Sequence, residues 1–206
     1  MRPVVGIVDY QSGNVRSVAN AVENAGGTVR DVRKSADMAG CTHLILPGVG
    51  AFGFCAERLQ ASGLLPALEQ WALLEQKPLL GICVGMQLLA DYSEEHGRQT
   101  GLGWIGGAVR KLENDGAGTV RIPHVGWNEV EFSQPLGEFK AGDIANFYFD
   151  HSYAYDAADS DCEVGSCRHG RRFSALIRRH NILAAQFHPE KRQTQGMRVL
   201  RAFFAC

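Results

Sequence analysis

The chain has 206 residues, with 21 basic and 22 acidic side chains and a formal net charge of -1. This length suits one well-buried α/β domain and is short for two, so we expect a single domain over residues 1–206. The balanced charge disfavours nucleic acid as a partner. The apolar runs are too short to cross a membrane, and the six cysteines form no Cys-x-x-Cys pair, so we expect a cytoplasmic protein without a membrane partner.

Short β-rich runs alternate with helical patterns in the first half of the chain. Strands are predicted at 4–9, 28–32, 43–46 and 79–82. Apolar residues recur at helical spacing within 15–25, 52–61 and 64–75. This βαβα order predicts a parallel sheet with helices on both faces.

The second half of the chain changes character. Shorter β-like stretches occur at 127–132, 146–151, 173–179 and 182–187, separated by Gly and Asp turns, and a closing helix is predicted from about Gln193 to Phe204. These strands are expected to extend the sheet or to form a smaller antiparallel layer. The predicted fold class is α/β, with a mostly parallel central sheet flanked by helices on both faces and a smaller antiparallel β portion in the C-terminal half.

One cysteine lies between the predicted strand at 79–82 and a helix-like run. Gly81 and Gly85 flank Cys83 two residues before and two residues after it. A sharp strand-to-helix turn needs small residues there, and Gly-x-Cys-x-Gly repeats the logic of the Gly-x-Ser-x-Gly nucleophile elbow. A helix starting at Val84 would direct free N–H groups toward the sulfur and favour the thiolate. We interpret Cys83 as a nucleophile rather than an ordinary buried cysteine.

A candidate base follows the predicted strand at 182–187. His188 is separated from Glu190 by Pro189, whose extended conformation turns the two side chains toward the same side. A lone histidine is more often structural, but here the carboxylate can fix the tautomer and orientation of the ring. The three residues predict a relay in which Cys83 attacks an acyl carbon, His188 carries the proton to the leaving nitrogen, and Glu190 orients His188.

An acyl intermediate also needs fixed N–H donors for its oxyanion. The N–H of Val84 is the nearest candidate, and the glycine-rich loop at 47–52 should lie beside the elbow. On its motif alone this loop fits a plain turn or a phosphate cradle as well, although it lacks the Gly-Lys-Ser/Thr ending of a P-loop. No metal site is predicted, because no histidine or cysteine pair has ligand spacing.

The segments at 81–87, 47–52 and 188–190 together resemble the class I, triad-type glutamine amidotransferases over nearly the whole chain. Within that class, the four segments at 9–18, 47–52, 123–128 and 188–191 are similar to the glutaminase subunits of imidazole glycerol phosphate synthase. The resemblance implies hydrolysis of glutamine to glutamate and ammonia without a cofactor. The ammonia would pass, within a heterodimer, to a (β/α)8-barrel cyclase subunit that forms imidazole glycerol phosphate and aminoimidazole carboxamide ribotide in histidine biosynthesis.

The resemblance also implies roles for residues outside the Cys83, His188 and Glu190 triad. The residues implied to donate backbone N–H groups to the oxyanion are Val84, Val49 and Gly50. The residues implied to hold glutamine are Gln87, Glu95, His151, Ser152 and Tyr153. A carboxylate such as that of Glu95 suits the substrate ammonium, with Glu94 as the alternative. The residues implied to lie near the cyclase interface and ammonia exit are Trp127, Tyr148 and Lys191.

Three positions depart from the family pattern: Gln11 stands where glycine is usual, Val84 where leucine is common, and Arg192 where a small residue often follows. Val84 acts through its backbone, so the chemistry is unaffected, whereas Arg192 lies beside the expected interface. The alternative functions are a glutaminase subunit for anthranilate, guanylate or pyridoxal phosphate synthesis, a cysteine hydrolase acting on peptides, and a non-catalytic regulatory homologue.

Overall fold

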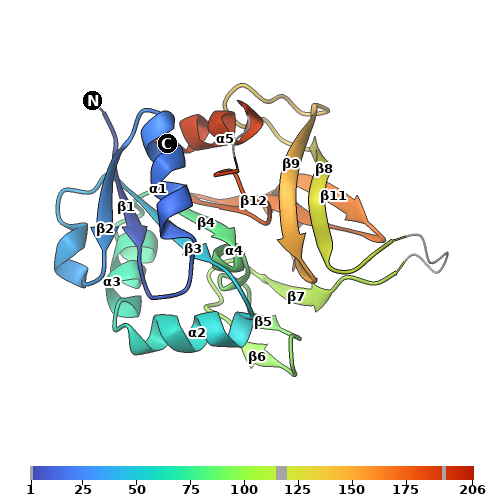
Figure 1. Ribbon diagram of the computed structural model, residues 1–206, viewed down its shortest axis with the longest axis horizontal. Helices are drawn as coiled ribbons and strands as arrows, with labels where there is room; N and C mark the ends of the chain where they lie inside the picture. The colour runs from blue at the N-terminus through green and yellow to red at the C-terminus, as the bar shows by residue number, and fades with distance from the viewer. Residues whose placement is uncertain (1, 115–119, 192–193) are drawn as a thin grey trace.

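Two β-sheets organise the part of the chain that the computed structural model describes, residues 2–114, 120–191 and 194–206 (Figure 1). The larger sheet contains, in spatial order, β2 (Thr28–Val32), β1 (Val4–Val8), β3 (His43–Gly48), β4 (Leu79–Cys83), β13 (Ile182–Ala185), β12 (Arg171–Arg179), β11 (Glu163–His169), β8 (His124–Phe132) and β9 (Ile144–His151). The smaller sheet contains β10 (Tyr153–Ala157), β7 (Gly107–Lys111), β5 (Tyr92–Ser93) and β6 (Gln99–Thr100).

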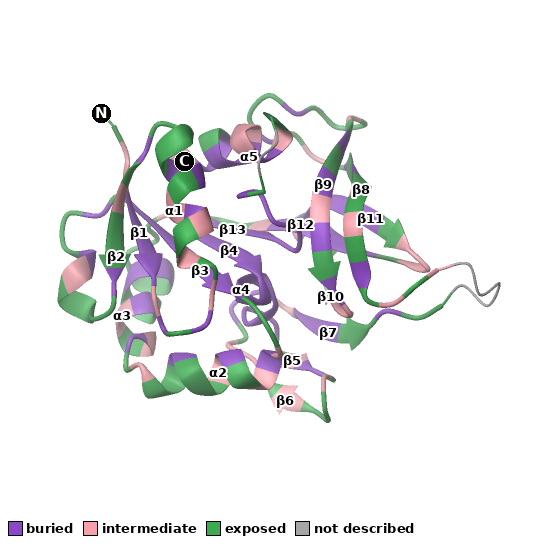
Figure 2. Ribbon diagram, in the orientation of Figure 1, coloured by how far each residue is buried: buried purple, intermediate pink, exposed green. Residues whose placement is uncertain are grey.

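The larger sheet has a parallel half and an antiparallel half. Strands β2, β1, β3, β4 and β13 pair in parallel, which confirms the sheet predicted from the βαβα order. From β13 onward, β12, β11, β8 and β9 pair antiparallel to their neighbours. Strands β3, β4 and β13 are buried along their whole length, as expected for parallel strands that are covered on both faces (Figure 2).

Helices cover both faces of the parallel half (Figure 1). Helix α1 (Val15–Asn24) packs on β1 and β2 and contacts α5 (Thr194–Phe204), while α2 (Phe52–Ala61) and α3 (Leu65–Glu69) lie on the other side. The helix predicted at 64–75 is α3 followed by a π-helical turn, η2 (Gln70–Leu74). The described residues also include two 3-10 turns, η1 (Ser35–Met38) and η3 (Ser160–Cys162). Within the described ranges no helix has the length and apolar character needed to cross a membrane.

The antiparallel strands predicted for the C-terminal half extend the larger sheet. The sequence also predicted a smaller antiparallel β portion, and the structure has a second, smaller sheet, but three of its four strands come from residues 92–111, where no strand was predicted. Its strands β5 and β6 have two residues each, too few for an alternating pattern to be read. Strand β10 packs beside β12, so the smaller sheet lies against the larger one.

The turn after β4 leads directly into the single helical turn α4 (Val84–Gln87), as predicted from the two glycines. A Cβ on Gly85 would lie 1.9 Å from the carbonyl oxygen of Leu46 in β3. A Cβ on Gly81 would lie 2.9 Å from the carbonyl oxygen of Gly85. Only glycine allows α4 to approach β3 this closely, because the opposing atoms belong to the backbone and cannot move aside.

We expect Gly85→Ala to lower the free energy of unfolding by about 1–3 kcal/mol, because the new methyl overlaps a backbone oxygen in a packed interior. Gly106→Ala is the matched control, since its Cβ would meet nothing closer than 3.8 Å. Urea denaturation of both variants checks the prediction. Equal stability of the two variants would contradict the steric role assigned to Gly85.

Candidate active site

A cavity of about 370 Å³ opens at the end of β4. The side chains and backbone that line it come from β4 and α4, the loop after β3, the turn after β5, the residue before β8, the junction between β9 and β10 and the segment after β13. The lining residues are Val49, Gly50, Cys83, Val84, Gln87, Glu95, Pro123, Asp150, His151, Ser152, Tyr153 and His188. The fold therefore gathers into one cavity the candidate nucleophile, the candidate base and all the residues predicted to hold the oxyanion or glutamine.

Cys83 lies at the apex of the turn and is almost fully buried, with 3% of its surface exposed. Its backbone has φ 54° and ψ -112°, a combination that residues with a Cβ rarely adopt. Such strain persists where the surrounding structure imposes it, and it is typical of functional sites. Helix α4 has only four residues, so the helix dipole is weaker than the sequence pattern suggested.

His188 reaches the cavity because β13 pairs in parallel with β4, and its backbone N–H donates to the carbonyl of Tyr148 at 2.9 Å. Its Nδ1 lies 2.7 Å from Oε1 of Glu190, and both side chains are buried. Burial alone would lower the pKa of His188, but the interactions with Cys83 and then with Glu190 outweigh it and raise that pKa to about 10. The ring therefore holds a proton near neutral pH, beside the buried sulfur of Cys83.

Glu95 is placed at the cavity wall by the turn between β5 and β6. Its Oε2 accepts a hydrogen bond from the N–H of Phe52 at 2.6 Å, which ties the carboxylate to the first turn of α2. Glu94 is exposed and pairs instead with Arg110, its Oε1 lying 3.4 Å from Nε. Of the two adjacent carboxylates, only Glu95 lines the cavity.

Gln87 and Gln186 connect the cavity wall to the sulfur. Nε2 of Gln87 donates to the carbonyl of Tyr153 at 2.8 Å and to Oε1 of Gln186 at 3.1 Å. Nε2 of Gln186 in turn lies 3.9 Å from Sγ of Cys83. Sequence reasoning missed Gln186, although its position two residues before His188 places both side chains on the same side of an extended segment.

Hydrogen bonds from two side chains fix the loop after β3. The carbonyl of Val49 accepts hydrogen bonds from Oγ of Ser12 at 3.1 Å and Sγ of Cys55 at 3.3 Å. The C=O and the following N–H of a trans peptide point in opposite directions, so the N–H of Gly50 points away from these two side chains. Gly50 has φ 95°, which residues with a Cβ disfavour. Val49, Gly50 and Val84 line the cavity together.

Trp127, Tyr148 and Lys191 form a surface cluster beside the cavity. Trp127 and Tyr148 face each other across β8 and β9, with their ring centroids 5.6 Å apart, and Trp127 is 51% exposed. Nζ of Lys191 lies 5.0 Å from the centroid of Tyr148. The Tyr148 ring is 6.4 Å from the ring of His188, so this surface adjoins the candidate base.

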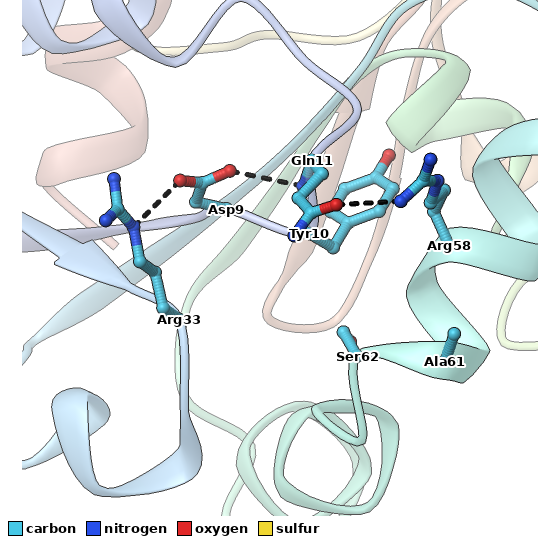
Figure 3. Close-up of a pocket in the computed structure, with 7 residues that line it drawn as sticks. All are labelled: Asp9, Tyr10, Gln11, Arg33, Arg58, Ala61 and Ser62. Carbon is cyan, nitrogen blue, oxygen red and sulfur yellow. Dashed lines mark hydrogen bonds and ion pairs between the residues drawn. The ribbon is translucent and has the colours of Figure 1, made fainter.

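A second cavity of about 500 Å³ lies where β1 ends, beside the C-terminal part of α2 (Figure 3). Gln11 there has φ 63°, a left-handed conformation that glycine adopts without steric cost and that residues with a Cβ disfavour. Oε1 of Gln11 accepts from Nη1 of Arg58 at 2.7 Å, and Asp9 pairs with Arg33 at 2.9 Å (Figure 3). The candidate nucleophile and base line the other cavity, so the chemistry is assigned there. In the described ranges no group of three or more His, Cys, Asp or Glu side chains is arranged to hold a metal ion.

Comparison with known proteins places the chain in a family. The family model "Glutamine amidotransferase class-I" matches residues 6–206. The chain belongs to the class I glutamine amidotransferases. "Imidazole glycerol phosphate synthase subunit HisH" from Rhodospirillum rubrum is 42% identical over 97% of both chains. The subunit of the same name from Zymomonas mobilis is also 42% identical, over 97% of this chain and 94% of its own.

Solved structures share the class I amidotransferase fold. A crystal structure described as a glutamine amidotransferase superposes with a TM-score of 0.75 at 23% identity, covering 98% of this chain and 97% of its own. The structure of PurLQS from Thermotoga maritima gives a TM-score of 0.74 at 18% identity, covering 100% and 99%. At these identities the likeness concerns the fold alone, and it confirms the predicted α/β class.

Two buried histidines beside the cavity have strongly lowered pKa values. Burial is the main cause for both, and it lowers the pKa of His124 to about 3 and that of His151 to about 4. Unfolded histidine titrates near 6.5. Between about pH 4 and 6.5 the unfolded chain therefore binds more protons than the folded chain at these two positions.

We expect the free energy of unfolding to fall as the pH is lowered through this window, and His124→Asn to show a shallower fall than the wild type. The exposed His96 gives the matched control, His96→Asn, which should keep the wild-type dependence. Urea midpoints between pH 4.5 and 7.5 measure the effect. His188 has a raised pKa, so its contribution to the free energy of unfolding changes in a different pH window, above the pKa of unfolded histidine. Identical curves for wild type and His124→Asn would refute the prediction.

Proposed function

We propose that the chain hydrolyses glutamine to glutamate and ammonia through a thioester on Cys83, and supplies the ammonia to the cyclase subunit of imidazole glycerol phosphate synthase in histidine biosynthesis. The observation that carries this proposal is the cavity shared by Cys83 at a strained elbow and His188 bonded to Glu190. The relation to subunits named HisH over 97% of the chain supports it. The proposal takes residues 1–206 as one functional unit.

The reaction follows from the charge arrangement. The sulfur of Cys83 attacks the side-chain amide carbon of glutamine, and the oxyanion that forms accepts hydrogen bonds from backbone N–H groups of Val84 and of the loop at 49–50. His188 then gives its proton to the leaving nitrogen, and ammonia departs. The neutral ring next takes a proton from water, which attacks the thioester and releases glutamate. Glu190 keeps Nδ1 of His188 engaged throughout, so the other ring nitrogen serves the reacting atoms.

Glutamine recognition is assigned to other residues that line the same cavity. The carboxylate of Glu95 suits the substrate ammonium, and it is already oriented by the N–H of Phe52. Backbone groups at Ser152 and Tyr153 are proposed to meet the substrate carboxylate. Gln87 donates through Nε2 to protein acceptors, so its Oε1 is the atom proposed to contact the ligand. A cavity of about 370 Å³ suits an amino acid better than an extended peptide.

The partner is proposed to be a (β/α)8-barrel cyclase that docks on the cluster of Trp127, Tyr148 and Lys191 as a heterodimer. An exposed tryptophan packed edge-to-face against a tyrosine is typical of interface anchors. Because the cluster adjoins His188, ammonia released in the cavity emerges next to the docked subunit. The proposal includes a reducing cytoplasm, which would preserve a free thiol at position 83.

We expect Cys83→Ala and Cys83→Ser to lower glutamine turnover by at least about a thousandfold, because the covalent route is lost. Cys167 offers the matched control: it is also buried, in β11, but does not line the cavity, and Cys167→Ala should keep wild-type turnover. Ammonia release from glutamine, measured with the cyclase subunit present, checks this. Substantial turnover by Cys83→Ala would refute the proposed mechanism.

We expect Trp127→Ala to raise the dissociation constant for the cyclase by about tenfold or more, because a central aromatic anchor is lost. Glutamine turnover by the isolated chain should stay near the wild-type value. Leu74→Ala is the control, since this exposed leucine lies in η2, before the start of β4. Calorimetric titration of the two subunits gives the constants. Equal weakening by both variants would contradict the assigned docking surface.

A further inference from the structure

A buried hydrogen-bond chain, which the proposed reaction does not use directly, connects β8 to the cavity wall. His124 in β8 and His151 in β9 are cross-strand neighbours, with Nδ1 of His124 3.1 Å from Nε2 of His151. The exposed fractions of the two rings are 3% and 7%. Beyond them, Asn128 lies 3.1 Å from the other nitrogen of His124, and the carbonyl of Tyr153 lies 2.9 Å from Nδ1 of His151.

At the first end of the hydrogen-bond chain, two backbone groups fix the side-chain amide of Asn128. Oδ1 of Asn128 accepts from the N–H of Glu129 at 2.8 Å, and Nδ2 donates to the carbonyl of Arg168 at 3.1 Å. These two bonds determine which end of the amide carries the nitrogen. The second hydrogen of Nδ2 is therefore donated to Nε2 of His124, and this ring must carry its own proton on Nδ1.

The other end of the hydrogen-bond chain requires donation in the same direction, from His124 to His151. The carbonyl of Tyr153 can only accept, so His151 must carry its proton on Nδ1 and present Nε2 as an acceptor. The only donor facing that Nε2 among the described residues is Nδ1 of His124. Backbone groups at both ends thus select one tautomer for each ring, with every bond of the chain satisfied.

The surroundings of His124 keep its ring neutral. The ring stacks on Phe149 at 4.6 Å and on His169 at 3.9 Å. Nε2 of His169 donates to the carbonyl of Arg121 at 2.8 Å, which assigns this third ring too. Burial is the main cause that lowers the pKa of His124 and of His151, so the neutral tautomers persist across the physiological range.

The hydrogen-bond chain ends at a backbone carbonyl that also accepts a hydrogen bond from a residue lining the active-site cavity. The carbonyl of Tyr153 accepts from Nδ1 of His151 and from Nε2 of Gln87. Gln87 continues to Gln186, which contacts the sulfur of Cys83. The position of the backbone at 151–153 therefore depends on the histidine pair from one side and on the glutamine pair from the other.

We propose that His124 is a positioning residue for glutamine binding: by donating from Nδ1 to His151, it fixes the ring and the backbone at 151–153 that form the substrate-facing wall. This inference rests on the proposed glutaminase function. Loss of the donor leaves a buried acceptor on His151 without a partner, and the wall loses its fixed position. The effect falls on substrate binding, because the bonds of His188 to Glu190 and Tyr148 are independent of it.

Two variants at position 124 separate the hydrogen bond from packing. The amide nitrogen of asparagine can occupy the place of Nδ1, so His124→Asn keeps a donor, whereas His124→Leu fills the site without one. In the complex with the cyclase, we expect His124→Leu to raise KM for glutamine by about tenfold and to change kcat by less than about threefold. His124→Asn should restore KM to near the wild-type value.

The tautomers are tested without any variant. In wild-type protein labelled with ¹⁵N-histidine, long-range ¹H–¹⁵N correlation at pH 7 should show His124 and His151 protonated on Nδ1. A proton on Nε2 of either ring would overturn the inference, as would an unchanged KM in His124→Leu or an equal rise in KM in both variants. Absence of glutamine turnover in the wild-type complex would instead refute the proposed function, while normal turnover with an unchanged KM in His124→Leu would refute the positioning role alone.

Discussion

Parallel pairing of β13 with β4 is the constraint on which the site depends. Ala185 lies opposite Ile82 in this register, so the residues that follow the two strands emerge at the same edge of the sheet. Cys83 comes directly after Ile82, and His188 follows Ala185 by three residues. The backbone register therefore brings together segments separated by about a hundred residues, as expected because ligand sites of parallel sheets form where the strands end.

The sequence predicted the features that depend on local stereochemistry. Gly81 and Gly85 identified the elbow because a Cβ at either position overlaps a backbone atom, which is a constraint within one short segment. The spacing of His188 and Glu190 predicted their contact for the same reason. The parallel half of the sheet was also predictable, since strands buried on both faces form continuous apolar runs.

The features that the sequence could not predict depend on register between distant segments. Strands β5 and β6 are too short to show a period, so the sequence predicted a smaller β portion but not these two strands of it. The contact between His124 and His151 exists only because β8 and β9 pair in one register, and a shift by one residue would turn each ring to the opposite face. At Gln11 the left-handed backbone is accompanied by a side-chain bond to Arg58, a compensation that involves a residue of α2.

The same pair of strands serves two surfaces because side chains alternate along a strand. In β8, Val125 and Trp127 are exposed while His124 is buried, and in β9 the cross-strand partner His151 is buried too. The proposed docking surface and the proposed glutamine wall are thus opposite faces of one two-stranded segment at the edge of the sheet. Because β9 has no further strand beside it among the described residues, it is held in register by β8, by the packing beneath and by the backbone hydrogen bond from His188 to Tyr148. A partner bound to the outer face therefore restrains the backbone of β8 and β9, whose inner side chains form the proposed glutamine wall. Partner docking and glutamine binding are thus connected through these two strands rather than through the whole domain.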